Sequence, residues 1–127
     1  MAKILVIDDD SYAVKLMEAI LTDWHHQVLT AYDGPSGAWA AKTHRPDLII
    51  SDFLMPGVPG ESLFDLLDKQ PETREIPLFV VSGIAPDKIQ SYIPAKHWSH
   101  IFQKPVDRDR LQKALDEILA SQDAKTL

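Results

Sequence analysis

Five residues with chemically active side chains lie at or just after the end of a short apolar run in this 127-residue sequence: Asp8, Asp9, Asp52, Ser82 and Lys104. Three carboxylates in one cleft would repel one another unless a cation lay among them. Because the chain has no cysteine and no histidines at a metal-binding spacing, hard oxygen ligands favour Mg²⁺, which binds carboxylates, phosphate oxygens and water. Lys104 would then neutralise a phosphoryl oxygen, and Ser82 would donate a hydrogen bond. The set is suited to phosphoryl transfer onto an aspartate, a reaction that depends mainly on positioning and charge stabilisation.

These residues can act together only if the apolar runs are neighbouring strands of one sheet. Three runs are continuously apolar, as strands covered on both faces are: Ile4–Ile7, Leu48–Ile50 and Leu78–Val81. The runs Val28–Ala31 and Ile101–Phe102 are weaker or shorter, which indicates edge strands.

Helical patterns separate the five runs. Apolar residues at helical spacing predict helices around residues 13–24, 38–41, 63–67, 87–93 and 111–119, the last with Asp107 as its N-cap. The alternation of strands and helices implies a parallel sheet with right-handed crossovers. The sequence therefore predicts an α/β fold: a flavodoxin-like, doubly wound, five-stranded parallel sheet of order 2-1-3-4-5 with five helices. Ligands bind such sheets at the carboxyl ends of the strands, where all five residues fall.

Several of these residues also have an ordinary structural interpretation. Asp10, which follows the acidic pair, is equally consistent with a helix cap and with a role in the site. Ser82 alone could be a turn residue, and Lys104 alone could be a solvated loop lysine. Independent turn residues need not converge on one edge of a sheet, so the combination favours a site.

The composition limits the class of protein. The chain contains 13 Lys and Arg against 19 Asp and Glu, a net charge of −6, which argues against direct contact with nucleic acid. No apolar run approaches the roughly 20 residues of a membrane span, and no signal peptide is visible, so we expect a cytoplasmic protein that does not bind a membrane. We expect one domain over residues 1–121, followed by a polar C-terminal tail over residues 122–127.

Five short motifs occur in order along the chain: Ile4–Asp10, Pro46–Asp52, Met55–Pro56 with Gly60, Val80–Gly83, and Lys104–Pro105. Each is weak alone, but together they resemble the motifs of bacterial two-component response-regulator receiver domains, of the chemotaxis-regulator type. The likeness covers Lys3 to about Ala120, and its order and spacing make it specific.

This resemblance implies a role for each member of the acidic set. Asp52 would accept the phosphoryl group. Asp9 would bind Mg²⁺ directly together with Asp52, while Asp8 would bind the ion through a water. The backbone carbonyl of Leu54 would complete the metal site.

The resemblance also implies a switch. Ser82 would move toward the phosphate and Lys104 would contact it, with a cis peptide bond between Lys104 and Pro105. The family has an aromatic switch residue three positions before this lysine, where this sequence has Ile101. In the loop after the phosphoacceptor, Pro59 replaces an acid that many members carry. These two departures bear on signalling rather than on phosphorylation.

The predicted function is a phosphoacceptor receiver domain in two-component signalling, which takes a phosphoryl group from a histidine kinase or a phosphotransfer protein. It would promote only its own phosphorylation and dephosphorylation, and is not otherwise expected to be an enzyme. It would signal to a downstream protein or effector domain through the face formed by the fourth helix, the fifth strand and the fifth helix. A weak homodimer is compatible with this assignment.

Two other functions fit parts of the pattern. One is a phosphorylation-independent interaction module of the same fold, which would neither bind Mg²⁺ nor accept phosphate. The other is a haloacid-dehalogenase-like phosphatase, because Asp8 and Asp10 have the Asp-x-Asp spacing of that class. Against the phosphatase, Tyr12 stands where that class has Thr or Val.

Overall fold

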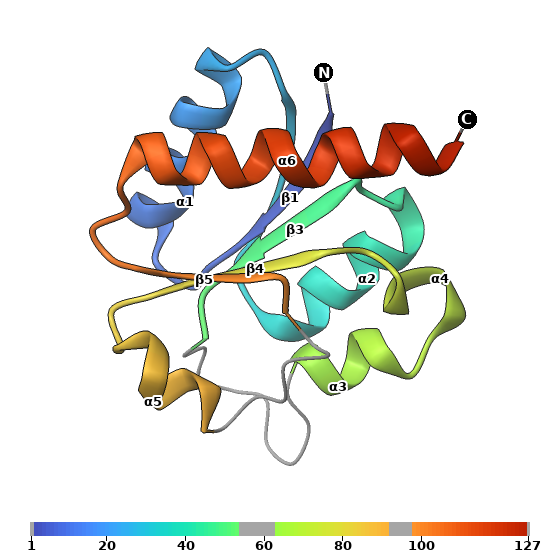
Figure 1. Cartoon of the computed structure of the whole chain (residues 1–127). Coiled ribbons are helices and arrows are strands. Elements are labelled where there is room, and N and C mark those ends of the chain that lie inside the picture. The colour runs from blue at the N-terminus through green and yellow to red at the C-terminus, as the bar shows by residue number, and fades with distance from the viewer. Residues whose placement is uncertain (1, 54–62, 92–97, 127) are drawn as a thin grey trace.

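Five parallel strands form a single sheet at the centre of the computed structural model, which describes residues 2–53, 63–91 and 98–126 (Figure 1). The strands are β1 (Lys3–Ile7), β2 (Gln27–Ala31), β3 (Leu48–Ser51), β4 (Leu78–Ser82) and β5 (His100–Gln103). Their order across the sheet is β2-β1-β3-β4-β5, and every neighbouring pair is parallel. The predicted order is confirmed, and the two weak apolar runs are the edge strands β2 and β5.

The described residues form six helices where the sequence predicted five. They are α1 (Ser11–Asp23), α2 (Gly34–His44), α3 (Leu63–Asp68), α4 (Pro71–Arg74), α5 (Pro86–Gln90) and α6 (Arg108–Thr126). The additional helix, α4, is one short turn that begins at a proline, a residue that suits the first helical position. Helix α6 continues to Thr126, so residues 122–126, expected to be a polar tail, extend the last helix.

The helices cover both faces of the sheet and divide the core in two. Helices α1 and α6 cover one face, where Leu21 and Leu115 are fully buried with alternate side chains of the strands. Helices α2, α3 and α5 cover the other face, where Ala41, Phe64 and Ile89 are buried (Figure 1). Burial on both faces explains why the inner strands are continuously apolar rather than alternating.

Two aspartates set the starts of the first two helices. Asp10 is the N-cap of α1, and its side chain accepts a hydrogen bond from the Tyr12 backbone N–H at 3.0 Å. Asp33 caps α2 and accepts from the Ser36 backbone N–H at 2.7 Å. The Ser36 contact lowers the pKa of the Asp33 carboxyl, because the bond favours the charged form. Within the described residues, no helix is long and apolar enough to cross a membrane.

Helix α2 lies unusually close to β1. A Cβ added to Gly37 would come within 2.5 Å of the Ile7 side chain, so a larger residue here would force that side chain to shift. Ile7 is the last residue of β1 and is fully buried. The close approach therefore lies next to the end of the strand from which the acidic residues continue.

Candidate functional site

Three carboxylates gather at the carboxyl ends of the adjacent strands β1 and β3. Asp8 and Asp9 follow β1, Asp52 follows β3, and one carboxylate oxygen from each lies within 4.8 Å of the others. Asp8 is buried, Asp52 is partly buried and Asp9 is exposed. All three offer hard oxygen ligands, and the exposed Asp9 lets an ion reach them from solvent. The cluster therefore fits a Mg²⁺ ion.

Lys104 joins two of these acids across the sheet. Its Nζ lies 2.9 Å from Asp8 Oδ2 and 3.3 Å from Asp52 Oδ2. Burial by itself acts to lower the pKa of Lys104, but the hydrogen bonds to Asp8 and Asp52 and their negative charges outweigh it, so the pKa lies above its usual value. The ammonium group is therefore charged at neutral pH and offsets part of the repulsion among the acids.

The backbone around Lys104 fixes its position. The peptide bond between Lys104 and Pro105 is cis. The Lys104 backbone N–H donates to the carbonyl of Ser82 at 2.8 Å, which ties the end of β5 to the end of β4.

Asp8 is held from two sides. One carboxylate oxygen accepts from Lys104, and the other accepts from the Asp10 backbone N–H at 3.0 Å. The Asp10 side chain caps α1 instead of joining the cluster, so the cap interpretation of this residue is the one that the structure favours.

Asp52 is fixed through its backbone. Its N–H donates to the Ile7 carbonyl at 3.0 Å, and its own carbonyl accepts from the Ser51 hydroxyl at 2.9 Å. The sequence motifs predicted no role for Ser51. Its position could have indicated one, because Ser51 is a polar residue within a buried strand, directly before the acid.

Ser82 ends β4 on the same side of the sheet and is buried. Its hydroxyl accepts a hydrogen bond from the Ile84 backbone N–H at 3.2 Å. Ile101 on β5 is partly buried and packs against the core under α2, α3 and α5, as does Ile84. Leu54 and Pro59, which the sequence assigned to the metal site and the adjoining loop, lie outside the described residues.

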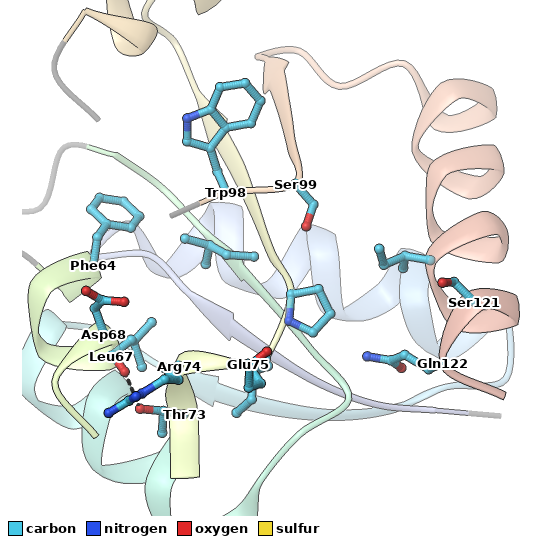
Figure 2. Close-up of a pocket in the computed structure, with 14 residues that line it drawn as sticks. Phe64, Leu67, Asp68, Thr73, Arg74, Glu75, Trp98, Ser99, Ser121 and Gln122 are labelled. Carbon is cyan, nitrogen blue, oxygen red and sulfur yellow. Dashed lines mark hydrogen bonds between the residues drawn. The ribbon is translucent and has the colours of Figure 1, made fainter. Parts of the chain in front are cut away.

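A hollow of about 470 Å³ lies at the opposite edge of the sheet, between α3–α4 and the last turns of α6 (Figure 2). Figure 2 shows Phe64 and Trp98 on one side of it and Ser121 and Gln122 on the other. None of the five chemically active residues lines this hollow. A small cavity of about 30 Å³ is lined by Asp8, Asp52 and Lys104, so these reactive groups lie together at the carboxyl ends of the strands.

Comparison with known proteins identifies this arrangement. The family model of the response regulator receiver domain matches residues 4–116. The chain belongs to this family. It is 32% identical over 120 residues to protein PilH of Pseudomonas aeruginosa, covering 94% of this chain and 99% of PilH.

Other relatives of this receiver domain differ in length. It is 37% identical over 108 residues to the response regulator PleD of Caulobacter vibrioides, covering 84% of this chain but only 23% of PleD. The crystal structure of a response regulator from Desulfuromonas acetoxidans matches with a TM-score of 0.84 and 25% identity, covering 94% of this chain and 98% of that one. The receiver unit thus occurs both nearly alone and as part of longer proteins.

Proposed function

We propose that this receiver domain accepts a phosphoryl group on Asp52 from a phosphohistidine of a histidine kinase or phosphotransfer protein. The observation that carries the proposal is the Lys104 ammonium group, which lies between the carboxylates of Asp8 and Asp52 with Asp9 beside them. An ordinary surface salt bridge does not require three clustered acids. A site that brings a dianionic phosphate next to a carboxylate does require compensating positive charge, which Lys104 supplies. We expect the exchange to take place in the cytoplasm.

The proposed reaction is an in-line displacement at phosphorus. A carboxylate oxygen of Asp52 forms the new P–O bond, the P–N bond of the phosphohistidine breaks, and the released imidazole nitrogen takes a proton. Lys104 stabilises the negative charge on a phosphoryl oxygen, for which it must move from its contacts with the acids. Mg²⁺ held by Asp9 and Asp52, and by Asp8 through a water, would supply the remaining positive charge.

The structural response to phosphorylation would begin at Ser82. Its hydroxyl accepts from the Ile84 N–H, and donating its own proton to a phosphoryl oxygen would require it to turn toward Asp52. Ile101 is β-branched and stiff at χ1, so we expect α5 to respond more than the side chain of residue 101. The face of α5, β5 and α6 would then bind a downstream protein or effector domain.

Mass spectrometry can test the proposal. Incubation with Mg²⁺ and a small phosphodonor should add one phosphoryl group, labile to base, to the wild type but not to Asp52→Asn. Asp10→Asn is a matched control, since asparagine is an equally good N-cap and this side chain lies outside the cluster. It should be phosphorylated like the wild type.

Three outcomes would contradict the proposal. Equal labelling of Asp52→Asn and the wild type would show that another residue accepts the phosphoryl group. A wild type that neither binds Mg²⁺ nor accepts phosphate would favour the phosphorylation-independent module. Turnover of a phosphate ester without covalent labelling would favour a phosphatase.

A further inference from the structure

Ser51 is a buried polar residue that lies between two apolar neighbours in the sheet. Ser51 has no exposed surface, and its cross-strand neighbours Ile7 and Val80 are fully buried too. A buried hydroxyl without a partner is costly, and this one donates to the Asp52 carbonyl at 2.9 Å. The interaction joins the residue to its immediate neighbour, so its main effect is on the backbone of that neighbour.

The bond acts on the peptide group that follows Asp52, just beyond the end of β3. The peptide before Asp52 is fixed by its N–H bond to the Ile7 carbonyl. The peptide after Asp52 lies beyond the end of β3, where the strand pairing has stopped. The Ser51 hydroxyl fixes this second peptide, so the backbone is restrained on both sides of the acid.

We infer that Ser51 is a positioning residue for the phosphoacceptor. By holding the peptide that follows Asp52, its hydroxyl keeps the carboxylate in the place where it meets Lys104 at 3.3 Å and lies within 4.8 Å of the other two acids. The inference rests on the proposed function, because it assigns to Ser51 the orientation of the group that accepts the phosphoryl group. The Ser51 hydroxyl acts through the Asp52 backbone, because its hydrogen bond goes to the Asp52 carbonyl.

Removing the donor should reduce both Mg²⁺ binding and the phosphorylation rate. Small displacements of a reacting group have large effects on rate, and one neutral hydrogen bond corresponds to a factor of about five in an equilibrium constant. We therefore expect Ser51→Ala to weaken Mg²⁺ binding and to lower the phosphorylation rate at saturating Mg²⁺ and phosphodonor, each by roughly fivefold. Ser51→Cys keeps a similar shape with a poor donor and should behave like Ser51→Ala.

Thr73→Val provides a matched control. Thr73 is also buried, at 2% exposure, and its hydroxyl donates to the Leu67 carbonyl at 2.6 Å, but it lines the hollow at the other edge of the sheet. Its loss removes a comparable hydrogen bond without touching the acids. Thermal unfolding of every variant shows how much stability each one loses.

The experiment measures Mg²⁺ affinity by isothermal titration calorimetry and phosphorylation rate by mass spectrometry. The inference is supported if both Ser51 variants lose affinity and maximal rate while Thr73→Val keeps wild-type values. It is overturned if either Ser51 variant matches the wild type, or if Thr73→Val is impaired to the same extent. The calorimetric measurement needs no phosphorylation, and a wild type that is not labelled would count against the proposed function instead.

Discussion

Replacing Lys104 with methionine should destabilise the fold in the absence of Mg²⁺ and strengthen the binding of the ion. Methionine keeps much of the length and the apolar stem of lysine but removes the charge. Asp8 and Asp52 would then face each other, with Asp9 close by, without the ammonium group that now lies 2.9 and 3.3 Å from two of them. Mg²⁺ bound as proposed would interact with the same carboxylates as Lys104, so the ion should bind more tightly when the lysine is gone.

The size of the effect follows from the geometry. At an effective dielectric constant of about 20, two unit charges roughly 3 Å apart attract by about 5 kcal/mol before desolvation is counted. Breaking a buried ion pair by removing one partner costs about 3–5 kcal/mol. The Lys104 side chain is 32% exposed, while those of Asp8 and Asp52 are 8% and 13% exposed. Solvent screening at the lysine lowers the cost, and we expect the free energy of unfolding to fall by about 2 kcal/mol.

Urea unfolding with and without Mg²⁺, combined with calorimetric titration of the ion, measures both effects. Added Mg²⁺ should stabilise Lys104→Met more than it stabilises the wild type, because ligand binding to the folded state raises its stability. Lys113→Met removes an exposed charge on α6 and is the control for loss of a lysine in general. The reasoning is refuted if Lys104→Met and Lys113→Met lose equal stability, or if Lys104→Met binds Mg²⁺ no more tightly than the wild type.

Three further predictions concern the scaffold. Gly37→Ala should lower the free energy of unfolding by about 1–3 kcal/mol through overpacking against Ile7, and a double variant with Ile7→Val should lose less than the sum of the single losses in denaturant unfolding. Burial lowers the pKa of His26, whose Nδ1 accepts a hydrogen bond from the Ala2 N–H. The contribution of His26 to stability is therefore present above pH 6.5, and it is lost as the pH falls from 6.5 through the lower pKa of the folded state. The stability difference between wild type and His26→Gln should therefore shrink just below pH 6.5, and a constant difference across that range would count against this assignment. Asp33→Ala should cost about 1 kcal/mol by loss of the α2 N-cap, whereas Asp33→Asn should be nearly neutral in thermal unfolding.

The sequence alone was sufficient for the order of the strands and for predicting that the reactive residues lie at one edge of the sheet. Continuous apolar runs marked the inner strands, because burial on both faces of a parallel sheet requires them, and weaker runs marked the edges β2 and β5. The reactive residues all lie at or just after the end of a strand, and parallel strands place their carboxyl ends on one edge. Asp8, Asp9, Asp52 and Lys104 could therefore be predicted to meet without knowledge of any contact.

The tertiary structure decided which atoms each of these side chains contacts. Whether Asp10 caps α1 or joins the acids depends on the direction of one side chain, and periodicity does not encode that direction. The short helix α4 carries a buried Thr73, which bonds to the Leu67 carbonyl, and no repeating apolar pattern marks so short a turn.

The contacts of the site itself also depended on the folded chain. The sequence does not show which group the Ser51 hydroxyl bonds to. In the folded sheet it lies between its cross-strand neighbours and donates to the Asp52 carbonyl. Lys104 lies 96 residues from Asp8 in the sequence, yet their side chains are 2.9 Å apart. Local patterns determine which residues are buried and which elements form, but hydrogen bonds and ion pairs require atoms at defined distances, and for distant residues only the assembled sheet sets those distances.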